Sequence, residues 1–244
     1  MSSFQLKIIA IVSMLIDHIA WGLAASAYIR THFVTEINAM HIAGRMAFPI
    51  FAFLISEGVV HTRSVKKYLA GMCVFALISE IPYNLLHSVY RFHTLNICYP
   101  RMQNVFFTLA LGIIAIIFYK KMIRETALFN RCTCFLLIIL TLIAACILRV
   151  DYGWLMVLAI LILYIYKDSQ LRLPIFAVFI VIFYLLISYK ARIGWAAGAL
   201  CALVPLYCYN GQRGRNLNKW LFYAFYPVHL LIIALLAATV FGYV

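Results

Sequence analysis

Residues 6–20 read Leu-Lys-Ile-Ile-Ala-Ile-Val-Ser-Met-Leu-Ile-Asp-His-Ile-Ala, an apolar run with an acid and an imidazole near its end. The run extends to about residue 27, long enough for a helix to cross the roughly 30 Å hydrocarbon core of a bilayer. Ala25-Ser26-Ala27 imitates the cleavage site of a secretory signal. Asp17 and His18 argue against that reading, because a removable signal rarely carries ionisable residues in its apolar region. We therefore predict a retained transmembrane helix over 5–27.

The rest of the chain has the same character. Of its 244 residues, 66% are hydrophobic and 11% are charged, compared with roughly 45–50% and 25% in soluble domains. We expect an all-α polytopic integral membrane protein with about nine transmembrane helices (eight to ten), in a single domain over 1–244 and with no soluble domain. Between 133 and 209 the polar breaks are short, so tilted pairs or half-helices are alternatives to three full crossings there. The predicted helices cover 5–27, 46–61, 66–87, 103–123, 133–149, 152–167, 173–189, 192–209 and 217–241.

The net charge of +13 raises the question of a nucleic-acid partner. The Lys and Arg residues are scattered over the loops between apolar runs, with no long basic and aromatic stretch, so we expect no nucleic acid. Thirteen of them lie at the N-terminus and in the even-numbered loops and six in the odd-numbered loops, which predicts a cytoplasmic N-terminus. Nine spans would then place the C-terminus outside.

The seven cysteines contain no C-x-x-C pair and mostly fall inside apolar runs. This spacing favours packing residues over a zinc site or a disulfide framework. We therefore expect no metal.

Ionisable residues inside the predicted spans are few. A charge at the bilayer centre costs at least about 2.5–3.5 kcal/mol, so each one is a candidate functional group. At about 1.5 Å per residue, four of them lie roughly 18–21 Å from the cytoplasmic ends of their helices. These four are Asp17, His18, Glu80 and His229, and Glu57 in the second helix is a fifth buried acid. The shared depth predicts one polar layer.

Asp17 and His18 are adjacent, so their side chains point about 100° apart on a helix. A carboxylate that orients His18 would therefore come more naturally from another helix, and Glu80 is our candidate. An imidazole held by a carboxylate is the usual general base for an amine or hydroxyl nucleophile. The alternative is a structural network of ion pairs and hydrogen bonds that holds the helices together.

Three further segments place polar residues at or within the outer ends of spans. Arg45, in Gly44-Arg45-Met46-Ala47-Phe48-Pro49, would hold a carboxylate of the site or a developing oxyanion, or would simply snorkel to the interface. Ser79-Glu80-Ile81-Pro82-Tyr83-Asn84 and the segment that begins at Gln103-Asn104 suggest a polar cavity toward the outer side. Asp151 opens a helix there and would serve equally as a plain N-terminal cap.

These segments resemble the TraX family, named for the protein that acetylates the N-terminus of F-type conjugative pilin. More distantly, they are similar to transmembrane acyltransferases with an intramembrane catalytic His. The matching segments run in order over essentially the whole chain, and 110–215 is the least specific region. They are Leu6–Ala10, Met14–Ile19, Gly44–Phe53, Glu57-Gly58, Ser79–Tyr83, Asn104–Leu109, Asp151–Gly153 and Phe225–Leu231.

The resemblance implies transfer of an acetyl or acyl group from acyl-coenzyme A to an acceptor at or across the bacterial cytoplasmic membrane. The catalytic candidates are His18 as base with Asp17, Glu80 and His229. The candidates for binding substrate or an oxyanion are Arg45, Asn84, Asn104, Tyr226 and Asp151. Lys66, Lys67, Arg213, Arg215 and Lys219 would hold the phosphates of coenzyme A, although positive-inside topology explains the same residues.

The acceptor implied by the resemblance is open: a peptide N-terminus, a sugar or a lipid. A proton-coupled transporter or flippase is the main competing interpretation, because buried Asp, Glu and His residues also build proton relays. A structural membrane subunit is the third. In that case Asp17, His18 and His229 would be replaceable without loss beyond stability.

Overall fold

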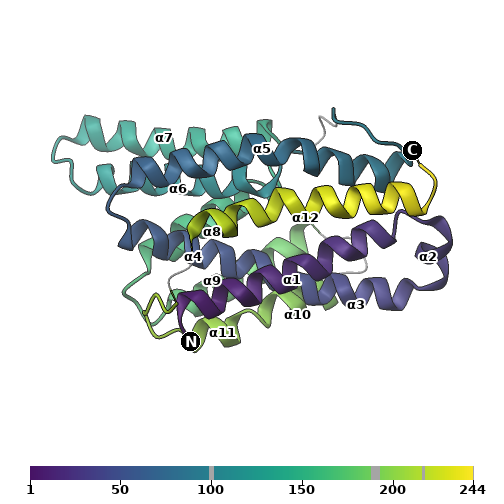
Figure 1. Cartoon of the computed structure of the whole chain (residues 1–244). Coiled ribbons are helices and arrows are strands. Elements are labelled where there is room, and N and C mark those ends of the chain that lie inside the picture. The colour runs from purple at the N-terminus through teal and green to yellow at the C-terminus, as the bar shows by residue number, and fades with distance from the viewer. Residues whose placement is uncertain (99–101, 188–192, 216–217, 244) are drawn as a thin grey trace. The chain divides into compact units, whose positions relative to one another are not determined.

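The computed structural model describes residues 1–98, 102–187, 193–215 and 218–243, and the regular structure within these ranges is helical (Figure 1). The helices are α1 (Ser3–Leu23), α2 (Ala27–His32), α3 (Val34–Gly44), α4 (Ala47–His61), α5 (Val65–Phe92), α6 (Val105–Met122), α7 (Leu128–Ile147), α8 (Gly153–Ile165), α9 (Arg172–Ile187), α10 (Ile193–Leu200), α11 (Leu203–Tyr207) and α12 (Lys219–Val240).

Six helical segments among the described residues are long and apolar enough to cross a membrane. They are Ser3–Leu23, Val34–His61, Val65–Phe92, Val105–Met122, Leu128–Ile147 and Lys219–Val240. The prediction of an all-α membrane protein is therefore confirmed at this level, and the count of nine spans is not. The remaining apolar helices α8, α9 and α10 with α11 are each shorter than the roughly 20 residues that a crossing needs. The predicted helix ends at 189, 192 and 217 lie outside the described residues.

The predicted start of the second helix, at residue 46, is wrong. The span starts at Val34 instead of residue 46, and α3 and α4 are separated only by Arg45 and Met46. Glu36, Asn38 and His41 give this segment the polarity of a loop. The segment can be helical because two of these polar side chains are hydrogen-bonded to other helices: His41 to Asp17 of α1, and Asn38 to Trp195 of α10.

The described chain forms two compact units. The first contains Met1–Phe51, Leu77–Pro100 and Ile180–Val244, and the second contains Ala52–Ala76 and Arg101–Phe179. The unit boundaries fall inside α4, α5 and α9, each of which contributes residues to both units. A single domain over 1–244 stays a prediction.

In the first unit, α1 and α12 run parallel and in contact. Near their beginnings the rings of Phe4 and Phe222 lie 6.4 Å apart, and further along His18 lies beside His229. At the next turn a Cβ on Gly22 would overlap the side chain of Ile233. Small residues permit such close helix approach in membranes. The two helices therefore start at the same end of the unit.

Helix α3 packs between α1 and α10 in the same unit, and glycines again set the spacing. A Cβ on Gly44 would overlap the Asp17 side chain, and one on Gly198 would overlap the backbone carbonyl of Ile42. The hydroxyl of Ser13 donates to the carbonyl oxygen of Ala43 over 2.7 Å and ties α1 to α3. These contacts bring the end of α3 directly against the acid of α1.

In the second unit, α6 packs against α7 and α8. Gly112 of α6 faces Ile160 of α8 at a distance that leaves no room for a Cβ. Outward-facing apolar side chains such as Phe129 and Ile147 of α7 stay 80% and 75% exposed. Apolar exposure on this scale suits a helix that faces lipid, where the surrounding chains are themselves apolar.

Candidate functional site

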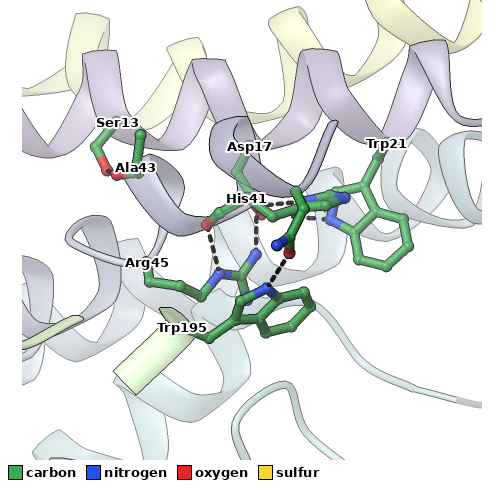
Figure 2. A network of polar contacts seen from close by, with 8 residues as sticks. Ser13, Asp17, Trp21, His41, Ala43, Arg45 and Trp195 are labelled. Atoms are coloured by element: carbon green, nitrogen blue, oxygen red, sulfur yellow. Dashed lines mark hydrogen bonds and ion pairs between the residues drawn. The ribbon is translucent and has the colours of Figure 1, made fainter. Parts of the chain in front are cut away.

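The carboxylate of Asp17 is the centre of a buried polar network in the first unit (Figure 2). Its Oδ1 accepts hydrogen bonds from Nη2 of Arg45 and from Nδ1 of His41, the latter at 2.8 Å. Its Oδ2 accepts from the indole N–H of Trp21 at 3.3 Å. Asp17, His41 and Arg45 are all less than 10% exposed. The acid therefore stays paired and hydrogen-bonded, as a charge in an apolar interior requires.

The spacing of His41 and Arg45 explains why both reach one carboxylate. Residues four apart lie on the same face of a helix, and the end of α3 carries both toward α1. The Nε of Arg45 also donates at 3.2 Å to the backbone carbonyl of His41, which accepts from the backbone N–H of Arg45 as well. The guanidinium thus pairs with Asp17 and is fixed to the end of α3 at once.

Two indole rings flank the imidazole of His41. The ring centroids of Trp21 and Trp195 lie 4.8 and 5.6 Å from that of His41. The guanidinium carbon of Arg45 lies 4.5 Å from the Trp195 ring centroid, a cation–π contact. The indole N–H of Trp195 donates to the side-chain oxygen of Asn38 at 3.0 Å. The indole N–H groups of both tryptophans are therefore hydrogen-bonded, and their rings lie next to the imidazole of His41.

His18 and His229 form a second polar contact, between α1 and α12. Nδ1 of His18 lies 2.6 Å from Nε2 of His229, and Nδ1 of His229 lies 2.6 Å from the carbonyl oxygen of Phe225. A carbonyl only accepts, so Nδ1 of a neutral His229 carries its proton and Nε2 is the acceptor. Nδ1 of His18 must then carry a proton as well. We assign the remaining lone pair of the pair to Nε2 of His18.

The C-terminal half of α5 contributes to the same region of the first unit. The rings of His87 and Tyr90 lie 6.2 and 4.7 Å from that of Trp21, and Nδ1 of His87 donates to the carbonyl of Tyr83 at 3.0 Å. The side-chain amide of Asn84 donates to the carbonyl of Ile97 at 2.9 Å. The polar residues of the site thus come from α1, α3, α5, α10 and α12.

The sequence model of a protein family described as "TraX protein" matches residues 2–237. The chain belongs to the TraX family. It is also similar to a protein of Dichelobacter nodosus described as "Probable fimbrial assembly protein FimC, serogroup H1". The two are 26% identical over 243 residues, which cover 95% of this chain and 94% of that protein. No solved structure matches the chain.

In this TraX-family chain, the structure brings together several of the residues that were predicted from the sequence to form the site. His18 contacts His229, and the ring of Tyr226 lies 5.8 Å from that of His18. Arg45 holds Asp17. The partner at Nδ1 of His18 is His229 instead of Glu80. Glu80 is half-buried on α5, and its role and that of Asn84 stay predictions.

Three of the basic candidates lie in the first unit, where they are exposed. Lys219 begins α12, and the carbonyl of Arg213 accepts hydrogen bonds from the backbone N–H of Phe4 and the hydroxyl of Ser3. Arg213 and Lys219 are thus at the end of the unit where α1 and α12 begin, with Arg215 between them in sequence. Positive charge gathers at this end, where Lys7 also lies.

The other candidates of the TraX-family chain belong to the second unit. Asn104 is fully buried and caps α6, and its amide N–H also donates to the carbonyl of Ala76 at 2.8 Å. The carbonyl of Asp151 accepts from the hydroxyl of Thr108, and its Oδ1 accepts from the N–H of Tyr152 at 3.0 Å. These hydrogen bonds of Asn104 and Asp151 connect α6 to its neighbours, and the predicted binding roles of the two residues stay predictions. Lys66 and Lys67 are exposed in the first turn of α5.

Sequence reasoning missed His41, Trp21 and Trp195. With the second span predicted to begin at residue 46, His41 falls in a loop, where a buried role is not expected. A signal was present: His41 precedes Arg45 by four residues and Gly44 by three, so a helix drawn through them places both polar side chains on one face.

Proposed function

We propose that the chain is a membrane-embedded acyltransferase that moves an acetyl or other acyl group from acyl-coenzyme A to an amine or hydroxyl of an acceptor at or across the membrane. Membership of the TraX family and the six apolar spans support this proposal. The observation that carries it is the hydrogen-bond chain from Phe225 through His229 to His18, which leaves a proton-accepting nitrogen at Nε2 of His18.

In the proposed reaction, Nε2 of His18 takes the proton of the acceptor N–H or O–H as that atom attacks the thioester carbonyl. The tetrahedral intermediate collapses, the C–S bond breaks, and coenzyme A leaves as a thiolate that takes up a proton. General-base catalysis of this kind contributes about 10²–10⁴-fold to a rate. The positive charge that forms on His18 is shared with His229 through their short hydrogen bond, so the base is stabilised in its protonated form.

Asp17 is a positioning residue in this scheme. Its carboxylate fixes Arg45, His41 and Trp21, and it is the residue next to the base. The charge of Arg45 balances that of Asp17 inside the apolar interior. The pair therefore builds a rigid, neutral wall beside His18.

The acyl donor is expected to enter from the end where α1 and α12 begin. Lys219 and His229 are ten residues apart on α12, so about 15 Å of helix separates the basic end from the base. Arg213, Arg215 and Lys219 are the candidates of the first unit for holding the phosphates. Lys66 and Lys67 stay separate candidates of the second unit. A cytoplasmic N-terminus in a bacterial inner membrane would place this end where coenzyme A is found.

A subunit of a bacterial surface fibre is the acceptor that the comparisons favour. The family is linked to acetylation of pilin, and the Dichelobacter relative is described as a probable fimbrial assembly protein. We therefore propose the N-terminal amine of such a subunit as the first acceptor to test, with sugars and lipids as the alternatives.

The proposal is tested with purified protein in detergent and with acetyl-coenzyme A. Wild type is expected to release coenzyme A and to label an acceptor in added membranes, and His18→Gln is expected to do neither. His32→Gln removes an exposed imidazole of α2 in the same unit and serves as the matched control. If proteoliposomes that contain the protein take up a solute and no thioester is cleaved, the result would support a transporter and overturn the proposal.

A further inference from the structure

His41 is a buried imidazole that the proposed reaction does not use. Its Nδ1 bonds to Oδ1 of Asp17, and a carboxylate paired with Arg45 accepts only. His41 therefore carries its proton on Nδ1 and a lone pair on Nε2. Within the described part of the chain, Nε2 of His41 has no hydrogen-bond partner, although the residue is only 7% exposed.

Nε2 of His41 is not among the fully enclosed side-chain atoms that lack a partner in the described chain, so it is accessible and can accept a hydrogen bond from a ligand that enters. The indole N–H groups of Trp21 and Trp195 do not supply it, because they bond to Asp17 and Asn38. What remains around the imidazole is one acceptor atom beside two indole rings, which are tilted by 57° and 48° against the imidazole. Such a setting suits a ligand that carries an N–H or O–H group next to apolar atoms.

The position along α1 indicates which substrate this is. The basic residues lie at the beginning of α1, whereas Asp17 and Trp21 lie in its final two turns. Trp21 also contacts Tyr90, which lies near the end of α5. The aromatic setting of His41 is thus at the depth of His18 and beyond it, on the side away from the basic end. A donor that enters from the basic end leaves this place to the acceptor.

We propose that Nε2 of His41 receives one N–H of an amine acceptor, beside the rings of Trp21 and Trp195, and so favours amines as acceptors. This inference rests on the proposed acyltransferase function. His41 accepts one hydrogen of the amine in a hydrogen bond, and His18, the base, takes the proton from another. Loss of His41 should then weaken transfer to an amine more than attack of water on the thioester.

The experiment measures how the acetyl group of acetyl-coenzyme A divides between water and an added acceptor. The probes are octylamine and octanol, with product and free coenzyme A quantified by mass spectrometry. His41→Phe keeps an aromatic ring and removes the acceptor atom. His41→Gln keeps an N–H for Asp17 and restores an oxygen acceptor. His32→Gln is the control on an exposed imidazole.

In His41→Phe, we expect the ratio of acylated octylamine to hydrolysis to fall at least tenfold. The ratio is taken within each variant, so a general loss of thioester cleavage does not produce this fall. His41→Gln should recover part of the ratio, which a purely structural role would not produce. An unchanged ratio in His41→Phe would overturn the inference, as would wild type that cleaves acetyl-coenzyme A but acylates neither probe.

A second readout separates this inference from the proposed function. Trp21 and Trp195 report on their surroundings by fluorescence, and octylamine should change wild-type emission but not that of His41→Phe. Absence of thioester cleavage with this binding signal intact would end the acyltransferase proposal and leave the binding site. Cleavage without a His41-dependent signal would end the binding site and leave the enzyme.

Discussion

Each unit contains a buried ion pair between helices, and the two differ in what they leave unused. In the second unit, Arg172 of α9 donates to Oε1 of Glu57 at 2.7 Å and to the hydroxyl of Ser56 at 3.0 Å, and its guanidinium lies over the Phe53 ring. In the first unit, Arg45 holds Asp17 in the same way. Imidazoles accompany both pairs. Nε2 of His61, on a side chain that is 64% exposed, lies 3.5 Å from Oε2 of Glu57, whereas His18 and His41 in the first unit each bond through Nδ1 and leave Nε2 open.

The comparison shows that a buried charge pair is not in itself a sign of catalysis. Arg172 and His61 both face the carboxylate of Glu57, and this group is expected to hold α4 to α9 without taking part in chemistry. Proton transfer needs a group that changes its protonation near neutral pH, which imidazole does and guanidinium does not. His61 of the second unit is an exposed side chain, whereas His18 and His41 are enclosed among the helices of the first unit, so we place the base in the first unit.

The largest expected effect comes from removing the base. His18→Gln should lower kcat/KM for acetyl-coenzyme A cleavage by about 10²–10⁴-fold, because general-base catalysis is lost. Glu57→Gln should leave the rate per folded molecule within about twofold. Steady-state kinetics on both variants, normalised to folded protein by size-exclusion chromatography, makes the comparison. Similar losses in both would mean that the two pairs are not different in kind.

The next effect is on stability and concerns the second unit. Arg172→Met leaves Glu57 with only His61, whose Nε2 lies 3.5 Å away, and removing one partner of a buried pair costs up to about 3–5 kcal/mol. The double change Glu57→Leu with Arg172→Met removes both charges and should return most of the loss. Thermal unfolding in detergent measures this. A double variant as unstable as the single one would show that the charges do more than pair.

The sequence predicted the helical class and a shared depth for His18 and His229, because depth along a helix can be counted from its residues. It did not predict which partner each group takes. Depth along a helix says nothing about which face points to which neighbour, so the contact of His18 with His229 could not be read from the sequence. The polar start of α3 was read as a loop, since the pairing of His41 and Arg45 with Asp17 depends on a distant part of the chain.

A smaller effect should follow at the partner of the base. His229→Leu removes the acceptor that holds the proton on Nδ1 of His18, so we expect a loss of roughly tenfold to a hundredfold in kcat, the range seen when the group that orients a reactive imidazole is removed. His229→Gln offers an oxygen to the same N–H and should lose less. Equal losses in both variants would argue that His229 fills space and does not orient His18.

The smallest effect belongs to a residue that the sequence nominated for substrate binding. Asn104→Ala removes a helix cap and a bond to Ala76 in the second unit, and should cost about 0.5–2 kcal/mol of stability. Its rate of acetyl-coenzyme A cleavage per folded molecule should match wild type. A rise in the KM for acetyl-coenzyme A, with the free energy of unfolding unchanged, would instead indicate that Asn104 binds the substrate.

The central claim is that His18 carries its proton on Nδ1, facing His229, and leaves Nε2 bare. Solid-state NMR of ¹⁵N-histidine-labelled protein in lipid bilayers reads this tautomer directly, with His18→Gln identifying the resonances. The account predicts a protonated Nδ1 hydrogen-bonded to a second imidazole and an unprotonated Nε2 at neutral pH. A proton on Nε2, with Nδ1 as the acceptor, would contradict it.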